Sequence, residues 1–319
     1  MRNLIHAEFY RYKRNGLIWL LLGAAFLSGV IFGLSVIING TFDDMFIIPL
    51  SVILAVFLSL EVGQEYNDGT IRNKIVAGHG RGEIYISKFV MAVVTSLIMT
   101  TVYLVPSVIL SAFVLWNNLQ MTSFLCILFG FYILNFVWAV VFTFVSLLIS
   151  KREVSAIVNF TLVIVVMLAA YQIEAMLGQP ETYQNYEYIS IEMTPEEVSQ
   201  VKDGSFTGSY SIQTDDDDTI TYYKEVVSDT DVEASKNPRY VEQPWRSVLS
   251  IIDTVLPNGQ INLYVEYLTD VKYISDMELE ADFDDSDYSI IYTYPFYSLV
   301  TVIVISGIGL MIFRKKEFK

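Results

Sequence analysis

Six apolar segments, each about 20 residues or longer, alternate with polar stretches along the chain of 319 residues. They cover residues 16–38, 45–63, 84–115, 124–150, 156–177 and 289–313. Because a helix of this length and composition crosses a bilayer, the pattern predicts an α-helical membrane protein with six transmembrane helices. The first segment is expected to stay as a span, since its apolar stretch is longer than that of a signal peptide and no small-x-small cleavage site follows it.

An amphipathic stretch at residues 3–14 precedes the first span. Its apolar residues Ile5, Phe9 and Tyr12 recur at near-helical spacing. The basic side chains near its end are Arg11, Lys13 and Arg14. This pattern predicts a short helix that lies in the membrane interface, with its basic groups near lipid phosphates. Ordinary basic flanking sequence is the alternative interpretation.

A polar island at residues 65–88, EYNDGTIRNKIVAGHGRGEIYISK, separates the second and third spans. Asn67, Asp68 or Thr70 can cap the start of a helix there. Gly78 can take the left-handed conformation that ends a helix. A short and locally well-specified helix is therefore predicted inside this connector.

The predicted helix at residues 71–77 makes about two turns. Ile71 and Ile75 share one face. The residues expected to be turned elsewhere are Arg72, Asn73 and Lys74. Because a plain connector needs only a few residues, this longer element is expected to dock another protein; a loop that packs only on its own bundle is the alternative.

The basic residues gather in the connections on one side of the predicted spans. Residues 1–15, 65–88, 151–152 and 314–319 hold 14 of the 20 Lys and Arg residues, and the short connections at 39–44 and 116–122 hold none. By the positive-inside rule, both termini and the polar island face the cytoplasm. The long segment at residues 178–288 then lies outside.

The outer segment accounts for the negative charge of the chain. It carries 25 of the 35 acidic residues and six basic ones, a formal charge of −19, so that the rest of the chain carries +4. Its acidic runs, 215–218 and 282–287, lack the EF-hand pattern and are expected to be solvated loops. The single cysteine, Cys126, lies within the fourth span, so the outer segment has no disulfide, which favours a bacterial plasma membrane.

The outer segment also changes its periodicity along its length. Alternating residues at 188–193, 208–213 and 219–227 predict strands. Residues 245–270 then show helical periodicity with a break at Pro257, which predicts helices resting on the outer membrane surface or on the tops of the spans. A mixed α/β extracytoplasmic domain is therefore expected between spans five and six.

Catalytic chemistry is missing from the sequence. There is no G-x-x-x-x-G-K-[ST] phosphate-binding loop, and the two histidines, His6 and His79, belong to no catalytic motif. We therefore expect no enzyme activity, no metal site and no cofactor in this chain, and no nucleic-acid partner. The most notable polar residues within or near the spans either form interhelical hydrogen bonds or line a translocation path: Asn135, Asn159, Gln172 and Glu174.

The motif E-x3-G-T-I-R-N-K-x3-G-x-x-R-x-x-I-Y-x-S-K, which follows the second of six spans, resembles the type-2 class of ABC transporter permeases. The N-terminal helix, the L-P-N-G-Q turn at 256–260 and the basic tail FRKKEFK at 313–319 are similar as well. The motif covers about 25 residues, and the layout covers the whole chain.

The resemblance implies a division of the chain into four parts. These are an elbow helix at 1–15, a five-span region at 16–177 with a coupling helix at 65–83, an acidic outer domain at 178–288, and a sixth span with a basic cytoplasmic tail at 289–319. The implied elbow residues are Arg11, Lys13 and Arg14. The implied coupling residues are Glu65, Gly69, Thr70, Arg72, Asn73, Lys74, Arg81 and Lys88.

The implied function is that of the transmembrane permease subunit of an ATP-driven exporter. A separate cytoplasmic ATPase would bind ATP and Mg, a second permease subunit would complete the assembly within the membrane lipids, and the substrate would be a peptide, a drug or a lipophilic compound, with antimicrobial-peptide export or immunity among the family's roles. A membrane receptor or sensor, whose acidic outer domain binds a ligand and whose cytoplasmic loop recruits a signalling protein, is the alternative.

Overall fold

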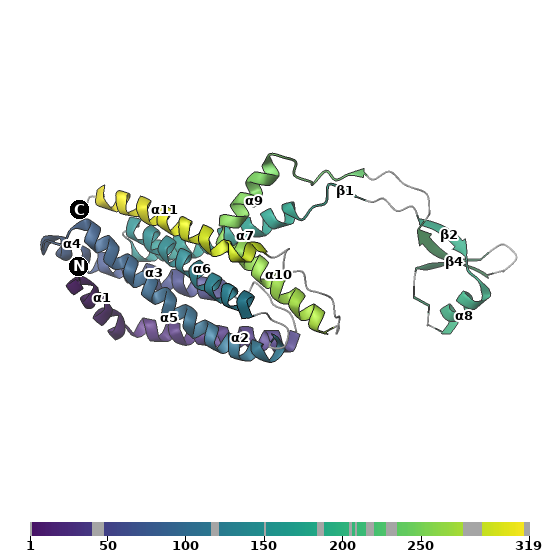
Figure 1. Ribbon diagram of the computed structural model, residues 1–319, viewed down its shortest axis with the longest axis horizontal. Helices are drawn as coiled ribbons and strands as arrows, with labels where there is room; N and C mark the ends of the chain where they lie inside the picture. Colours follow the sequence, from purple (N-terminus) through teal and green to yellow (C-terminus); the bar gives the residue numbers. More distant parts are fainter. Residues whose placement is uncertain are drawn as a thin grey trace. The chain divides into compact units, whose positions relative to one another are not determined.

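The computed structural model describes residues 2–39, 48–115, 121–149, 151–183, 188–203, 206–207, 209–214, 220–227, 235–276 and 289–315. Two compact units divide the chain (Figure 1). The first is helical and combines residues 1–174 with 244–319, and the second, at 175–243, contains the β-strands. The acidic runs at 215–218 and 282–287 lie outside the described residues. So does most of the two short connections at 39–44 and 116–122, which have no basic residues.

Within the described residues, six helices are long and apolar enough to cross a membrane. All six predicted spans are confirmed as helices, which is the arrangement of an α-helical, multi-pass membrane protein. Their bounds are Gly16–Asn39 (α2), Ile48–Asn67 (α3), Arg81–Leu115 (α5), Met121–Leu148 (α6), Arg152–Leu177 (α7) and Tyr294–Lys315 (α11). The last of these long helices, α11, begins later than predicted, because a 3-10 turn, Ser289–Tyr292, comes before it.

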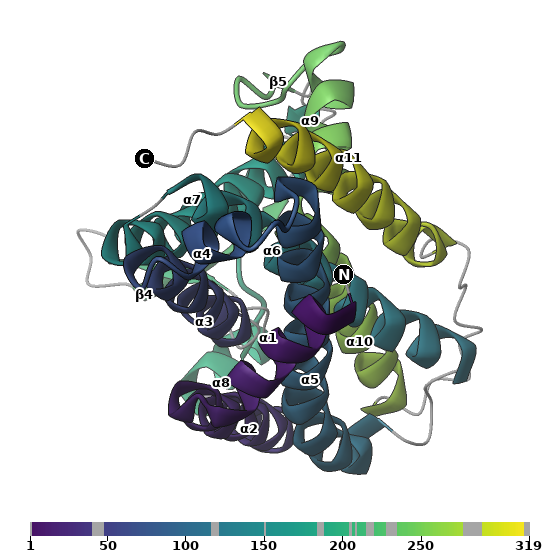
Figure 2. The ribbon, with the colours of Figure 1, turned by 90° about the vertical axis from the view of Figure 1, so that its left-hand side faces the viewer.

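Two short helices lie at one end of the first unit, α1 (Arg2–Arg14) before the first long helix and α4 (Thr70–Val76) between α3 and α5. The C-terminal end of α11 lies at the same end (Figure 1). Figure 2 looks onto this end, with the long helices running away from the viewer.

Glycines let α2 and α5 pack closely. A Cβ atom at Gly29 would collide with the backbone carbonyl of Tyr103, and one at Gly33 would lie 2.6 Å from Cβ of Leu110. Ser107 Oγ also donates to the Gly29 carbonyl at 3.1 Å. Small residues at such crossings are typical of membrane helices, where close packing replaces the hydrophobic effect as the driving force.

Two further helices follow the second unit: α9 (Trp245–Val255) and α10 (Pro257–Asp276). The predicted break lies between them, and Pro257 opens α10, where its missing N–H costs nothing. The α10 side chains Ile261, Tyr264 and Leu268 are buried in the main core, and Tyr264 lies against Gly130 of α6. α10 is thus part of the helical core, whereas the α9 side chains Trp245 and Ile251 are exposed.

The second unit holds short antiparallel strands. One sheet has three strands with β4 in the centre, and their bounds are Tyr188–Glu192 (β2), Tyr210–Thr214 (β3) and Ile220–Val227 (β4). These strands fall on the three predicted alternating runs. β1 (Thr182–Tyr183) pairs with β5 (Ser235–Lys236). A helix, α8 (Pro195–Asp203), starts with a capping box, because Thr194 and Glu197 each accept a hydrogen bond from the other's backbone N–H.

A test of the α2–α5 crossing compares two glycines of the same helix. We expect Gly29→Ala to lower the thermal unfolding temperature, because overpacking costs roughly 1–3 kcal/mol. Gly23→Ala is the matched control, since it gains the same helix propensity and no atom lies within 4 Å of its new Cβ. Equal unfolding temperatures for the two variants in mild detergent would contradict this packing.

Candidate functional site

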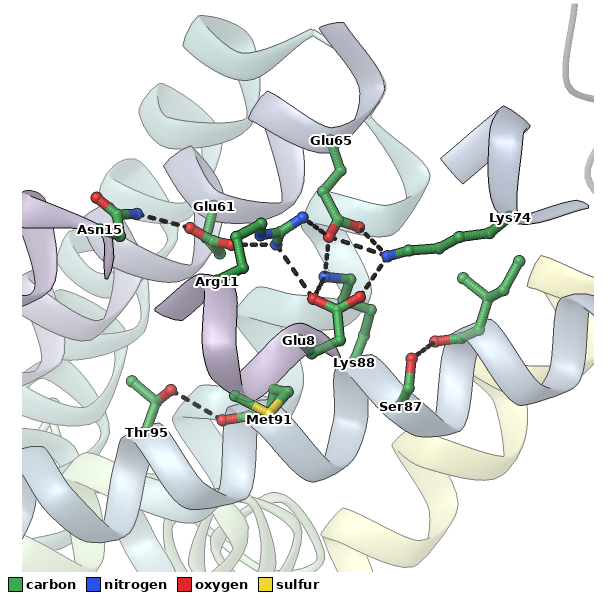
Figure 3. Close-up of polar contacts among 11 residues, drawn as sticks. Glu8, Arg11, Asn15, Glu61, Glu65, Lys74, Ser87, Lys88, Met91 and Thr95 are labelled. Atoms are coloured by element: carbon green, nitrogen blue, oxygen red, sulfur yellow. Dashed lines mark hydrogen bonds and ion pairs between the residues drawn. The ribbon is translucent and has the colours of Figure 1, made fainter. Parts of the chain in front are cut away.

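Six charged side chains meet where α1, α3, α4 and α5 come together (Figure 3). They form a charge cluster of three acids and three bases: Glu8, Arg11, Glu61, Glu65, Lys74 and Lys88. The formal charges of these groups sum to zero. All three carboxylates are buried, so the charges must satisfy one another rather than water.

Lys88 of α5 lies at the centre of the charge cluster with a side chain only 1% exposed. Its Nζ donates to Glu8 Oε2 at 2.8 Å and to Glu65 Oε1 at 2.5 Å. Lys74 of α4 reaches the same two carboxylates, bonding Glu8 and donating to the two Glu65 oxygens at 3.0 and 3.2 Å. Each of these glutamates therefore bridges two ammonium groups from different helices.

Arg11 closes the other side of the charge cluster. Its guanidinium pairs with Glu61 and Glu65 of α3 and lies 3.2 Å from Glu8 within its own helix. Asn15 adds a hydrogen bond of 2.9 Å from Nδ2 to Glu61 Oε2. Since breaking a buried ion pair leaves an uncompensated charge, these contacts fasten α1 to α3.

The surroundings shift the pKa values of the groups that α1 contributes. Burial alone would raise the pKa of Glu8, but the ammonium groups of Lys88 and Lys74 outweigh it and hold this pKa at about 2. Burial opposes the charge of Arg11, yet Glu65, Glu61 and Glu8 raise its pKa above the usual range. Both groups are therefore charged at neutral pH.

Two glycines bound α4. Gly69, at φ 65°, precedes its first residue without a side-chain cap, so the predicted caps are wrong: Asn67 ends α3, and the backbone N–H of Asp68 continues that helix by donating to Gln64. The predicted left-handed Gly78 is confirmed at φ 91°. Gly78 N–H donates to Ile75 and His79 N–H to Lys74, a Schellman motif that satisfies the last carbonyls.

α4 has two distinct faces. On the inner face Ile71 is 1% exposed, Ile75 packs against a small apolar core, and Lys74 enters the charge cluster. On the outer face Arg72 and Asn73 are exposed and Val76 is 80% exposed. The prediction that Lys74 turns away from Ile71 is wrong, because the buried carboxylates draw its ammonium group inward.

The other predicted coupling residues likewise include both buried and partly exposed positions. Glu65 and Lys88 are buried in the charge cluster, while Gly69 and Thr70 lie at the start of α4. Arg81 opens α5, and its Nη1 donates to the Arg314 carbonyl of α11 at 3.0 Å. The structure thus brings most of these residues to one end of the helical unit but exposes only part of them.

The predicted elbow residues Arg11, Lys13 and Arg14 lie in different surroundings. The buried row of α1 is Leu4, Glu8 and Tyr12, and the predicted apolar residue Phe9 is 52% exposed. α1 is rotated relative to this prediction because Glu8 pairs with the ammonium groups of Lys74 and Lys88. Of the three elbow basic side chains, Arg11 enters the charge cluster, Arg14 lies over the Tyr10 ring at 4.9 Å and Lys13 is exposed.

The residues predicted near a translocation path do not form one site. Asn159 is buried, and its Nδ2 lies 2.7 Å from Ser59 Oγ and 2.9 Å from Ser146 Oγ, which ties α7 to α3 and α6. Asn135 is buried and donates to the carbonyl one turn earlier. Gln172 and Glu174 are exposed, and Glu174 pairs with Asn262 of α10.

Sequence reasoning missed Glu8 and Glu61. A signal was present, because Glu61 and Glu65 lie four residues apart at the end of an apolar span, and acids in such a position pair with partners inside the protein. Among the described residues, no group of three or more His, Cys, Asp and Glu side chains is placed to hold a metal ion.

The fold and the charge cluster together define a multi-pass α-helical membrane protein. In it, the connector between α3 and α5 is fastened to α1. Compared with models of protein families, the sequence matches none, and no curated protein matches it. The features of this chain that point to a function are therefore α4 and the charge cluster beneath it.

A double-mutant cycle tests the pairing in the charge cluster. We expect Glu65→Gln alone to destabilise the protein by roughly 3–5 kcal/mol, because it leaves the buried charge cluster with one uncompensated positive charge. Combining it with Lys74→Gln restores neutrality, so the double variant should lose less stability than the sum of the two single variants. Thermal unfolding in detergent measures this, with the exposed Glu153→Gln as a control that should change little. Strict additivity would contradict the pairing.

The lowered pKa of Glu8 predicts a pH dependence. A carboxyl group whose pKa in the folded state lies below its ordinary value of 4.5 stabilises the fold above pH 4.5, and this contribution is lost as the pH falls towards 2. The difference in unfolding temperature between the unmodified protein and Glu8→Gln should therefore stay constant from pH 7 to pH 5 and shrink below pH 4.5. A constant difference down to pH 3 would mean that the fold does not lower the pKa of Glu8.

Proposed function

We propose that this chain is the transmembrane permease subunit of an ATP-driven ABC exporter. In this proposal α4 is the coupling helix that docks on a separate ATPase subunit, and α1 is the elbow helix. The observation that carries the proposal is the division of α4, whose inner face is fastened by Lys74 while Val76 on the outer face is 80% exposed. An exposed valine flanked by Arg72 and Asn73 is a small docking surface of mixed character.

The charge cluster suits the mechanical role of such a helix. Lys74 connects α4 to Glu8 of α1 and to Glu65 of α3, so a displacement of α4 acts on both carboxylates. These two carboxylates also bind Lys88 of α5. Moving one of these groups away from the others would leave buried charges incompletely compensated, which is costly. A movement at α4 is therefore transmitted to three helices together instead of being absorbed by a loose connector.

The proposed orientation places α1, α4 and the C-terminal end of α11 in the cytoplasm of a bacterium, with the chain in the plasma membrane. The basic residues near these ends support it through the positive-inside rule. The acidic segment at 178–288 would then face the outside and attract cationic molecules. The proposed substrate is a peptide, a drug or a lipophilic compound, and the proposed assembly contains a second permease subunit.

The outer face of α4 can be tested without disturbing the charge cluster. Arg72→Glu and Val76→Asp change only exposed side chains, whereas Lys74→Glu would break buried ion pairs. After gentle purification from native membranes, mass spectrometry should find a stoichiometric Walker-motif ATPase with the unmodified protein. We expect each variant to retain at least tenfold less of it, because a charge placed against a complementary surface costs more than about 1.4 kcal/mol.

Lys151→Glu is the matched control, because Lys151 is another exposed basic residue of the same predicted cytoplasmic side. It should retain the ATPase, and all variants should elute as single species with unchanged unfolding temperatures. Recovery of a kinase or another regulator in place of an ATPase would favour a receptor. Recovery of no partner under any condition would remove the energy source on which the exporter proposal depends.

A further inference from the structure

An apolar groove of about 500 Å³ lies between α1, α2 and α5. This volume falls within the range of ligand-binding pockets, about 300–1,000 Å³. Phe9, Trp19 and Leu22 line one part of the groove, and Val94 and Ile98 of α5 line another. Thr95 also contributes, but its hydroxyl is already satisfied by the Met91 carbonyl at 2.8 Å.

Lys13 brings a positive charge to this groove. Its side chain lines the groove and is exposed, and within the part of the chain that the structure describes its ammonium group has no ion-pair partner. The neighbouring basic side chains are engaged, Arg11 by the charge cluster and Arg14 by the Tyr10 ring. Lys13 is therefore the cation that an incoming anion would meet.

Trp19 holds the backbone of Lys13 close to the start of α2. Its Nε1 donates to the Lys13 carbonyl at 3.3 Å, which ties the end of α1 to the first turn of α2. The Trp19 ring is 62% exposed although it is large and apolar. A tryptophan near the end of a membrane helix, beside a lysine, is typical of the boundary between lipid tails and headgroups.

We propose that this groove binds an anionic phospholipid, with an acyl chain along the apolar lining and the phosphate on Lys13. Charge complementarity favours an anionic headgroup, and the continuity of the groove with exposed apolar residues such as Trp19 and Phe9 favours a lipid over a free anion. The site requires that α2 and α5 cross a bilayer. It does not depend on an ATPase partner, so the two proposals can fail separately.

Native mass spectrometry of the protein exchanged into an equimolar mixture of phosphatidylglycerol and phosphatidylcholine tests the site. We expect the unmodified protein to retain phosphatidylglycerol in preference. Lys13→Gln should reduce this retention about fivefold, because one basic residue near a membrane surface contributes about 1 kcal/mol of attraction. Lys151→Gln is the matched control and should leave it unchanged. Ile98→Trp, which fills the groove, should reduce the retention of both lipids.

Several outcomes would overturn the proposal. Equal losses in Lys13→Gln and Lys151→Gln would show a general surface attraction instead of a site. Equal retention of the two lipids would remove the role of Lys13, and displacement of phosphatidylglycerol by inorganic phosphate would show an anion site without an acyl chain. A change of oligomeric mass in Ile98→Trp with no change in bound lipid would show that the groove holds a second copy of the chain.

Discussion

Pairing of charges away from water determines how one end of the helical unit is built. Each carboxylate of the charge cluster is nearly inaccessible, so each needs cations from other helices to remain ionised without a large desolvation cost. This requirement sets the rotation of α1, in which Glu8 faces inward and Phe9 outward. It also sets the two faces of α4 and places Lys88 of α5 inside the protein, although a lysine is rarely found there.

The charge cluster and the apolar groove share α1. Glu8 and Arg11 of α1 belong to the charge cluster, while Phe9 and Lys13 line the groove. Tyr12 lies between them, and its ring meets Phe57 edge to face at 5.4 Å. A lipid in the groove and a protein on α4 would therefore both act on the orientation of α1. If each favours the same orientation, linkage requires that each strengthens the binding of the other.

The long helices could be predicted from sequence because hydropathy over 20 residues is a local property. The faces of α4 could not be predicted fully. Lys74 is three residues from Ile71, so the two side chains are neighbours on the helix surface, although the sequence predicted that Lys74 turns elsewhere. Its partners are Glu65, nine positions away, and Glu8, 66 positions away. A pairing over such a distance leaves no periodic trace in the sequence.

The charge cluster also orders events during synthesis of the chain. Glu8 leaves the ribosome 80 residues before Lys88, an interval of about 4–16 s at translation rates of about 5–20 residues per second. Until α3 and α4 have been made, the acidic and basic groups of α1 have no partners on other helices, so α1 must remain hydrated during that time. The set of ion pairs that holds α1 is complete only when Lys88 at the start of α5 has been made, so the final attachment of α1 comes long after its own synthesis.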